Sequence, residues 1–359
     1  MTLILGIETS CDETSVAVVE DGDRVLSNVV ASQIRKHAPY GGVVPELAAR
    51  EHLKAMDPVV RQALKDAGIN SLDEIDAIAA TNGPGLIPAL LVGVNYAKGL
   101  ATGNDLPFIG INHFIAHIYA TFLDSGIEQL REPSLYPLLA LVVSGGHTAL
   151  VLITADGQAT VVGTTIDDAA GEALDKASKL LGLGYPGGPV IEKTGANGDS
   201  SKYDFPRPLT GGAGKAVAEE NKYNFSFSGI KTSLLYHCKR LGGEDIALSE
   251  TEMFDTVASY QEAVIDVLVK KTLKAAKDFN AASIVLSGGV ACNGVLRQRL
   301  EDCTPKRIKL FLAPRKYCTD NAAMVAGLAF HHLRKGMTDP LTTDAFARLP
   351  QISQVPFTD

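Results

Sequence analysis

The sequence has no tryptophan, only five cysteines among 359 residues, and no surplus of basic side chains. The cysteines are odd in number and scattered, without a Cys-x-x-Cys spacing. This excludes a disulfide framework and favours reduced thiols in the cytoplasm. The formal net charge of -8 argues against a protein that coats nucleic acid through overall charge, although local basic clusters remain.

Long hydrophobic runs are also absent. No apolar run approaches the roughly 18–20 residues of a membrane span. The short apolar start is followed at once by Glu8, Asp12 and Glu13, so we expect neither a signal peptide nor a membrane association. The composition that remains, 46% hydrophobic and 21% charged, is typical of a globular chain, and its length favours two domains.

One strand–bend–strand pattern occurs twice. Two apolar runs within 139–153 flank Ser144-Gly145-Gly146-His147-Thr148 and predict a β-hairpin, which is either a plain turn or an anion-binding bend of bare backbone. An Asp-Gly turn and a third strand follow. The same order opens the chain, with strands at 3–10, 14–19 and 24–31 and a bend at 8–13. The repeat predicts two copies of one unit, about 135 residues apart.

The second half of each copy reads as strand, glycine turn and helix. Strand 75–81 leads into helix 87–101, and strand 283–287 leads through Gly288-Gly289 into helix 290–300. Further helices are predicted at 45–65, bent or broken near Pro58, at 168–181, at 251–278 with Thr251 as its cap, and at 324–333. Strands that alternate with helices predict an α/β fold with a mixed sheet in each half.

This layout resembles the actin, Hsp70 and sugar-kinase superfamily. The resemblance implies two duplicated, RNase H-like domains with mixed sheets flanked by helices and a central ligand cleft. We place the N-terminal domain at 1–130 plus 322–350, the C-terminal domain at 131–321 and a tail at 351–359. The resemblance to this superfamily also implies that the bends at 8–13 and 144–148 bind phosphates, and that Ser287-Gly288-Gly289 contacts adenosine.

Two histidines lie at i and i+4 in Asn112-His113-Phe114-Ile115-Ala116-His117. On a helix both rings would project from one face, which suits a metal ion, although a half-buried structural pair is the alternative. A third ligand is needed, and Asp320 is a candidate unless Thr319 or Asp320 simply caps the last helix. The residue after His113 is phenylalanine, so the general base of a zinc protease is missing.

Two other segments suit either a ligand-binding role or a purely structural one. Tyr185-Pro186-Gly187-Gly188-Pro189 gives bare backbone for a flat ligand or merely ends a helix, after a helix that carries Glu172 and Asp175. The aromatics and hydroxyls of 225–232 suit contact with RNA, a lid or a packed loop.

Together these segments resemble the TsaD family, the tRNA N6-adenosine threonylcarbamoyltransferases, once described as glycoproteases. The resemblance covers about residues 3 to 335. It rests on these motifs in order: Gly6-Ile7-Glu8-Thr9-Ser10-Cys11-Asp12-Glu13-Thr14, the 112–117 and 144–148 motifs, Asp167 to Lys176, 185–189, Phe205-Pro206-Arg207-Pro208, Ser228-Gly229-Ile230-Lys231-Thr232, Ser287 to Asn293, and Cys318-Thr319-Asp320-Asn321.

The resemblance implies a transferase that moves the threonylcarbamoyl group from threonylcarbamoyl-AMP to N6 of the adenosine immediately 3′ of the anticodon, in tRNAs that read ANN codons, with release of AMP. An ATP-dependent small-molecule kinase and a non-catalytic nucleotide-binding partner of the same fold stay open as alternatives. The implied partners are tRNA, a TsaB-like paralogue and a TsaE-like ATPase, in a homo- or hetero-oligomer.

Site residues follow from the same resemblance. His113, His117 and Asp320 are expected to hold one divalent metal, with iron favoured over zinc, and Asp12 or Glu13 to take the proton from N6. The expected substrate-binding residues are Val142, Val143, Ser144, Gly145, Gly146, Asp175, Gly188, Glu192 and Asn293. The loop at 211–224 is longer than the family pattern, and the tail after Gly336 has no role that we can assign.

Overall fold

The computed structural model describes residues 1–124, 126–211, 216–243, 245, 247–348, 350 and 352–358. The chain separates into two compact units. Unit 1 comprises Met1–Tyr136, Thr154–Ala159 and Ala313–Asp359, and unit 2 comprises Pro137–Ile153 and Thr160–Leu312. The domain boundaries drawn from the sequence stay a prediction.

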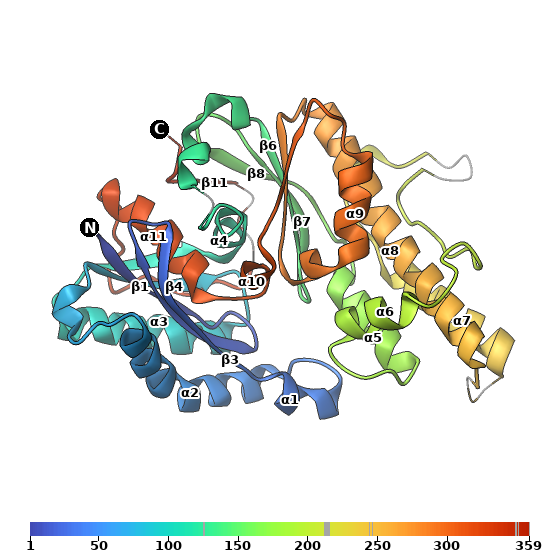
Figure 1. The fold of residues 1–359 in the computed structure, drawn as a ribbon, viewed down its shortest axis with the longest axis horizontal. Coiled ribbons are helices and arrows are strands. Elements are labelled where there is room, and N and C mark those ends of the chain that lie inside the picture. The colour runs from blue at the N-terminus through green and yellow to red at the C-terminus, as the bar shows by residue number, and fades with distance from the viewer. Residues whose placement is uncertain are drawn as a thin grey trace. The chain divides into compact units, whose positions relative to one another are not determined.

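Unit 1 is built on a mixed sheet, which has five strands among the described residues, in the order β3-β2-β1-β4-β5. Strands β1 to β3 are antiparallel, whereas β4 and β5 run parallel to β1 (Figure 1). The strands are β1 (Leu3–Glu8), β2 (Glu13–Glu20), β3 (Arg24–Ser32), β4 (Ala77–Gly83), β5 (Phe108–Asn112) and, outside this sheet, the short β11 (Ile352–Gln354).

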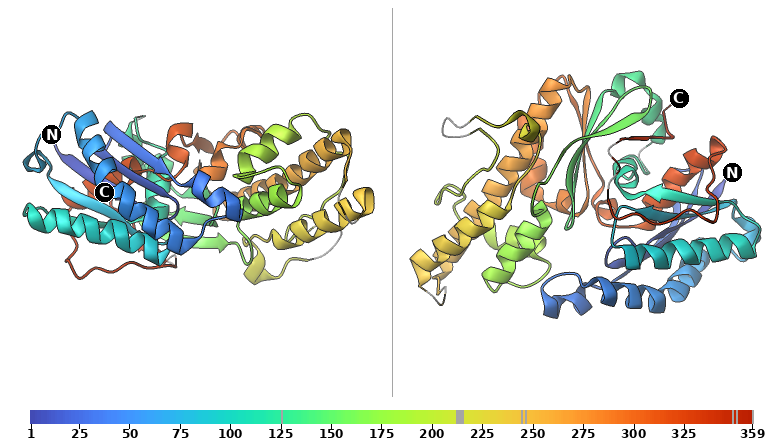
Figure 2. Two further views of the ribbon diagram at one scale, coloured as in Figure 1. Left: turned by 90° about the horizontal axis from the view of Figure 1, so that it is seen from below. Right: turned by 180° about the vertical axis from the view of Figure 1, so that it is seen from behind.

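Helices cover both faces of this sheet. The helices are α1 (Ile34–His37), α2 (Pro45–Asp66), α3 (Ile87–Gly103), α4 (His113–Tyr119), α10 (Arg315–Cys318) and α11 (Ala322–Arg334), with 3-10 turns at Ala38–Tyr40, Leu72–Glu74, Ile127–Arg131 and Pro133–Leu135. Helices α2 and α3 lie side by side on one face and α11 lies on the other (Figures 1 and 2). Odd-numbered side chains of β1, such as Leu5 and Ile7, pack with Met56 and Val60 of α2 in one buried cluster.

The backbone of α11 approaches β1 closely at Gly6. A Cβ atom there would lie 2.6 Å from the carbonyl oxygen of Ala322 and 2.7 Å from the nitrogen of Ala326. Only glycine fits such a contact, so Gly6 brings the start of α11 against the sheet.

Unit 2 repeats the topology of unit 1. Five strands of its sheet, in the order β8-β7-β6-β9-β10, match β3-β2-β1-β4-β5 one for one, and β9 and β10 again run parallel to the central strand. The strands are β6 (Leu138–Val143), β7 (Thr148–Ile153), β8 (Gln158–Thr164), β9 (Ser283–Ser287) and β10 (Lys309–Leu312). The first strands begin at Leu3 and Leu138, so the predicted repeat of about 135 residues is confirmed.

The helices of unit 2 are α5 (Ala170–Leu180), α6 (Gly187–Gly195), α7 (Ser228–Gly242), α8 (Glu250–Asp278) and α9 (Gly294–Cys303), with 3-10 turns at Glu219–Asn221 and Gly289–Cys292. The predicted buried face of α5 is confirmed, because Ala170, Leu174, Ala177 and Leu181 are all buried.

Two predicted helix details are wrong and a third is decided in part. Helix α2 continues through Pro58, so of the two alternatives at that residue, bent or broken, the break is wrong. The cap of α8 is Ser249 rather than Thr251, because Ser249 and Glu252 form a reciprocal capping box. Helix α9 begins at Gly294, since Asn293 accepts the Leu296 N–H and caps it.

The segment after α11 packs along unit 1. Asp339 N–H donates to the Phe108 carbonyl and Phe346 N–H to the Asn82 carbonyl, each at 2.9 Å. Near the end, Phe357 is buried with its ring 6.0 Å from that of Tyr119. The tail is therefore part of the packing of unit 1. In the 211–224 loop, residues 212–215 lie outside the described residues.

Candidate functional site

The histidine pair stands at the start of a short helix. The Asn112 side chain accepts the backbone N–H groups of Phe114 and Ile115 at 3.0 and 3.2 Å, so α4 begins at His113. His117 follows one turn later, and the two ring centroids are 4.5 Å apart. Both rings are buried. The predicted helical spacing of the pair is thus present, with both side chains on one face.

Asp320 comes from the loop before α11. Its Oδ1 lies 3.1 Å from His117 Nε2 and 3.6 Å from His113 Nε2. The alternative in which Thr319 or Asp320 caps the last helix is wrong, because Asn321 accepts the Met324 N–H and is the cap. The same Asn321 donates from Nδ2 to the Thr319 carbonyl, which holds the loop in shape. The Asp320 carboxylate therefore faces the two imidazoles.

The three side chains form a donor set that fits a divalent metal. Their ligand atoms all lie within 4.8 Å of one another. Two ligands held about 2.1 Å from one metal at a tetrahedral angle are about 3.4 Å apart, close to the two distances above. In addition, the buried His117 Nδ1 has no hydrogen-bond partner in the part of the chain that the structure describes. Two imidazoles and one carboxylate suit iron or zinc chemically.

Glu8 supports this set, and the sequence did not single it out. Its carboxylate is fully buried at the end of β1 and lies 3.1 Å from His113 Nδ1. Because a carboxylate can only accept, His113 Nδ1 carries the hydrogen and its Nε2 faces Asp320. Ser10 N–H and the Thr81 hydroxyl also donate to Glu8. A buried carboxylate behind a ligating histidine is the usual second partner of a metal site.

Charges around Glu8 and the histidines shift their pKa values in opposite directions. Burial lowers the pKa of His113, but the negative charges of Glu8 and Asp320 outweigh it and raise the pKa to about 9. Burial raises the pKa of Glu8, but attraction to His113 and hydrogen bonding bring it below its ordinary value. Burial and the neighbouring positive His113 lower the pKa of His117.

The bend between β1 and β2 carries the two predicted catalytic carboxylates. Asp12 is buried, and Glu13 accepts a hydrogen bond from the Ser32 hydroxyl at 3.1 Å. Burial, together with the charges of Asp12 and Asp320, raises the pKa of Glu13 well above its ordinary value. A raised pKa makes Glu13 a stronger proton acceptor than an ordinary carboxylate.

The second bend belongs to unit 2, between β6 and β7. Val142 and Val143 are buried in β6, so only their backbone can meet a ligand. Ser144 N–H donates to the His147 carbonyl at 2.8 Å and is therefore occupied within the turn. The space beside Gly145 and Gly146 is open, because no heavy atom lies within 4 Å of a Cβ built at either position. Gly145 and Gly146 therefore leave room for a ligand beside the bend, and the role of backbone donor across 144–146 stays a prediction.

The remaining predicted substrate residues meet around the starts of α6 and α9. Asp175 accepts the Gly187 N–H at 2.6 Å, and Glu192 accepts the Gly294 N–H at 2.8 Å. The Asn293 amide donates to Gln261 at 3.0 Å while its oxygen caps α9. Beside Gly188 there is open space. The polar side chains are thus fixed by backbone groups, and the bare backbone of Gly188 stands among them.

The segment 225–232 is a packed loop. Phe225 and Phe227 are fully buried with stacked rings, so these aromatics do not offer a surface to RNA. Asp167 accepts bonds from the hydroxyls of Ser226 and Ser228 and from two backbone N–H groups, which fixes the start of α7. The packed-loop interpretation is therefore the one that the structure favours.

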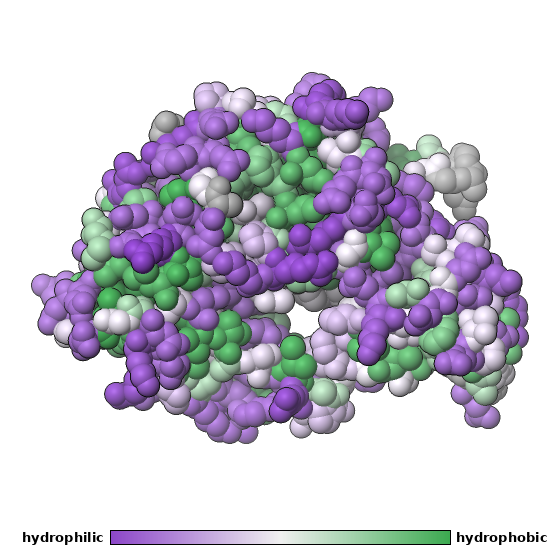
Figure 3. All heavy atoms as spheres, in the orientation of Figure 1, coloured by the Kyte–Doolittle hydropathy of each residue, from purple (hydrophilic) through white to green (hydrophobic). Residues whose placement is uncertain are grey.

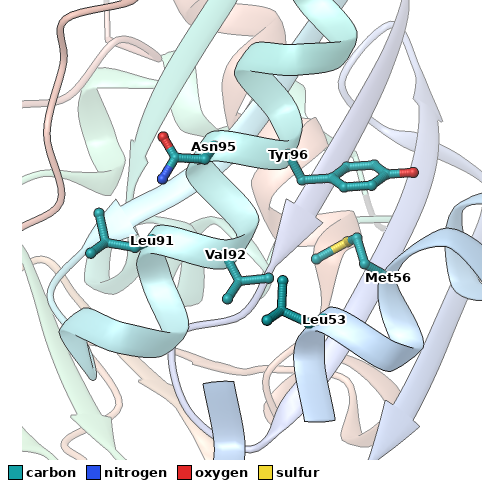
Figure 4. Close-up of a pocket in the computed structure, with 6 residues that line it drawn as sticks. All are labelled: Leu53, Met56, Leu91, Val92, Asn95 and Tyr96. Carbon is teal, nitrogen blue, oxygen red and sulfur yellow. The ribbon is translucent and has the colours of Figure 1, made fainter. Parts of the chain in front are cut away.

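An apolar groove runs between α2 and α3 in unit 1. It has a volume of about 360 Å³ and is lined by Leu53, Met56, Leu91, Val92, Asn95 and Tyr96 (Figure 4). Leu53 is 68% exposed and Leu91 36% exposed, whereas most large apolar side chains of these helices face the core. Figure 3 shows hydrophobic residues at the surface in this region.

Solved structures define the class of fold. The chain is similar to component A of the (R)-2-hydroxyglutaryl-CoA dehydratase of Acidaminococcus fermentans, with a TM-score of 0.53 and 15% identity. The match covers 92% of this chain and 98% of that one. It is also similar to full-length HypF in its phosphate- and nucleotide-bound form, covering 94% of this chain and 56% of that one, with a TM-score of 0.58 and 13% identity. Together with the duplicated sheets, this places the chain in the actin, Hsp70 and sugar-kinase class of folds.

Sequence relatives narrow the class to one family. The family model described as "TsaD: tRNA N6-adenosine threonylcarbamoyltransferase" matches residues 24–327. Proteins of that name from Thermosipho africanus and Syntrophus aciditrophicus are 47% and 48% identical, each over 97% of this chain and 99% and 97% of their own lengths. The chain therefore belongs to the TsaD family and is a transferase. The kinase and the non-catalytic partner are not favoured.

Within the described residues, none of the helices is both long and apolar enough to cross a membrane.

Proposed function

We propose that this chain transfers the threonylcarbamoyl group of threonylcarbamoyl-AMP to N6 of the adenosine immediately 3′ of the anticodon, in tRNAs that read ANN codons, and that it does so in the cytoplasm. The N6 nitrogen attacks the carbamoyl carbon, the bond from that carbon to the phosphate oxygen breaks, and AMP leaves while N6 loses a proton. The observation that carries the proposal is the buried His113–His117–Asp320 set with Glu8 behind it, in a chain of the TsaD family.

His113, His117 and Asp320 would hold one divalent metal ion, for which we favour iron and accept zinc. When bound there, the metal supplies a Lewis acid for an oxygen of the donor. Glu8 accepts a hydrogen bond from His113 Nδ1–H, which leaves His113 Nε2 directed toward Asp320. The protein's task at this site is thus to keep three ligands in place before the substrate arrives.

The bend of unit 2 would bind oxygens of the donor. No heavy atom lies within 4 Å of a Cβ built at Gly145 or Gly146, which leaves room for a ligand beside the bend. Successive N–H groups in a bend bind anions. Such donors also stabilise charge that develops on an acyl oxygen during transfer. Val142, Val143 and Ser144 would contribute backbone contacts beside them.

Asp175, Gly188, Glu192 and Asn293 would bind hydroxyl groups and the flat part of the nucleotide. A carboxylate accepts several hydrogen bonds, so Asp175 can hold the Gly187 N–H and a ribose hydroxyl together. Gly188 allows close approach because no side chain stands beside it. Because the side chains are already fixed by backbone groups, they need little reordering when the donor binds.

Asp12 or Glu13 would take the proton from N6. We favour Glu13, because burial and the charges of Asp12 and Asp320 raise its pKa, which makes it a better proton acceptor than an ordinary carboxylate. Positioning of the amine against the carbonyl could supply much of the rate as well.

The proposed partners are tRNA, a TsaB-like paralogue and a TsaE-like ATPase, in a homo- or hetero-oligomer. We place the paralogue on the α2–α3 groove, because a smaller copy of the same fold would present a matching pair of helices. Two such pairs can pack their apolar faces together. The acidic net charge fits a tRNA surface that the partners share.

Mass spectrometry of nucleosides tests the function. The chain is incubated with the two protein partners, threonylcarbamoyl-AMP and unmodified tRNA, and the tRNA is then digested. We expect N6-threonylcarbamoyladenosine and an equal amount of AMP. Absence of the modified nucleoside, or a phosphorylated small molecule formed from ATP in its place, would overturn the proposal.

A further inference from the structure

The bend that carries Asp12 and Glu13 is held by hydrogen bonds to its backbone carbonyls. The Cys11 carbonyl accepts from His52 Nε2 at 2.9 Å, and the Asp12 carbonyl accepts from Gln33 N–H at 3.0 Å. In a trans peptide the carbonyl and the following N–H point in opposite directions. The Asp12 N–H is therefore turned away from His52, because the Cys11 carbonyl is turned toward it.

His52 stands at one end of a chain of buried side chains. Gln33 Nε2 lies 3.3 Å from His52 Nδ1, and Gln33 Oε1 lies 3.0 Å from His37 Nε2. The Val44 N–H donates to His37 Nδ1 at 3.2 Å. His52, His37 and Gln33 are all buried, so these bonds are not exchanged with solvent.

The two end groups fix the direction of every bond. Val44 N–H can only donate, so His37 Nδ1 is an acceptor and His37 Nε2 carries the hydrogen. At the other end, the Cys11 carbonyl can only accept, so His52 Nε2 carries the hydrogen and its Nδ1 accepts. The donors therefore run in one direction, from Val44 through His37, Gln33 and His52 to Cys11, and both imidazoles are neutral.

One further contact agrees with this assignment, because Gln33 Nε2 also donates to the Ala48 carbonyl at 3.3 Å. The Thr14 hydroxyl lies 2.8 Å from His52 Nδ1, closer than Gln33 Nε2, so the two donors share the one lone pair of that nitrogen. Burial lowers the pKa of His52 and of His37, which favours the neutral form of both. The relay joins β2, α1 and α2 to the bend.

We infer that His52 is a positioning residue of the transfer reaction. Through its Nε2–H bond to the Cys11 carbonyl, supported by Gln33 and His37, it sets the orientation of the bend that presents Asp12 and Glu13. It touches neither substrate nor metal in this role. The inference rests on the proposed function for its kinetic consequence, but its structural part stands on the relay alone.

The tautomers of the histidines test the relay without any activity. In protein labelled with ¹⁵N-histidine, two-bond ¹⁵N–¹H correlation spectra at pH 7.5 should show His52 and His37 as neutral Nε2–H tautomers, assigned through His52→Gln and His37→Gln. In the Gln33→Met variant the His37 resonance should shift, because its acceptor is lost. An Nδ1–H tautomer or an imidazolium at His52 would overturn the relay, whether or not the chain modifies tRNA.

Kinetics with threonylcarbamoyl-AMP and tRNA test the positioning role in the full complex. His52→Phe keeps a planar ring but has no donor, and we expect kcat to fall by about 100-fold with unchanged metal content, because a misplacement of about 1 Å has that effect. His52→Gln keeps an amide donor at the same distance along the side chain. Its kcat should therefore be at least about tenfold higher than that of His52→Phe.

The matched control is His237→Phe in unit 2, another buried histidine, whose Nε2 is bonded to the Thr256 hydroxyl rather than to a bend. It should keep kcat within about twofold. Wild-type kcat in His52→Phe, or an equal loss in His52→Phe and His52→Gln while both retain the wild-type melting temperature, would overturn the inference. If His52→Phe does not fold, the Gln variant and the tautomer spectra still decide it.

Discussion

The Glu8 carboxylate accepts a hydrogen bond from His113 Nδ1 at 3.1 Å, although 105 positions separate the two residues in the chain. One is the last residue of β1 and the other is the first residue of α4. This contact fixes which nitrogen of His113 faces His117 and Asp320. The arrangement of the three proposed metal ligands therefore depends on a residue that is not itself one of them.

Glu8→Gln should weaken metal binding by about 10- to 100-fold, the usual effect of losing a carboxylate behind a ligating histidine. The amide can still accept one bond, but it no longer attracts the Nδ1 hydrogen as a charge does. Zinc and iron affinities measured by competition with a chelator check this. Glu46→Gln, at an exposed position in the first turn of α2, is the control. A Glu8→Gln protein that binds metal as tightly as the wild type would contradict the role.

Metal affinity should rise with pH between 7 and 9. The pKa of His113 is raised to about 9 in the metal-free protein, so the ring holds a proton at neutral pH that a metal must displace. One displaced proton gives about a tenfold gain in affinity per pH unit, levelling off above pH 9. Zinc titrations at pH 7, 8 and 9, corrected for protonation of the chelator, measure the slope. An affinity that does not change across this range would show that His113 binds no proton there.

Gly171→Ala should disturb the bend of unit 2. A Cβ at Gly171 would lie 2.5 Å from the Ser144 carbonyl oxygen and 2.7 Å from the Gly145 Cα. The bend must move, so we expect kcat/KM for threonylcarbamoyl-AMP to fall by about 10- to 100-fold. Gly99→Ala is the matched control, since it is helical, exposed and has no heavy atom within 4 Å. Equal kcat/KM in the two variants would exclude a role for this bend.

Leu53→Glu should weaken association with the TsaB-like paralogue by about tenfold or more, because a charge replaces the most exposed apolar side chain of the α2–α3 groove. Light scattering during gel filtration, at several protein concentrations, measures the association. Met337→Glu, also an exposed apolar position but away from the groove, should associate normally. If both variants associate as the wild type does, the partner binds elsewhere.

Much of the fold could be predicted from local patterns in the sequence. The two hairpins, the repeat and the spacing of His113 and His117 depend on residues close together in the chain, and such patterns are visible without a structure. Asp320 could be proposed as a third ligand on chemical grounds. Its alternative role as the cap of α11 was excluded only by the structure, in which Asn321 is the cap.

Contacts between distant segments could not be predicted in the same way. Nothing in the residues around Glu8 indicates that its carboxylate meets His113, and nothing around His52 indicates that it meets the Cys11 carbonyl. These contacts depend on how α2 and α4 pack against the sheet that contains β1. Similarly, Asn293 lies in a motif typical of ligand binding, but its oxygen caps α9, a use that depends on where that helix begins.

The most direct measurement uses threonylcarbamoyl-AMP labelled with ¹⁴C in the carbamoyl group, in a single turnover with excess complex and a tRNA that reads an ANN codon. The account predicts that the label appears on N6 of the adenosine 3′ of the anticodon with one AMP released per label. It also predicts that Asp320→Asn, which keeps the shape but not the charge of the third ligand, slows this step by at least about 100-fold. Label that stays in small molecules, or an Asp320→Asn protein that transfers at the wild-type rate, would contradict it.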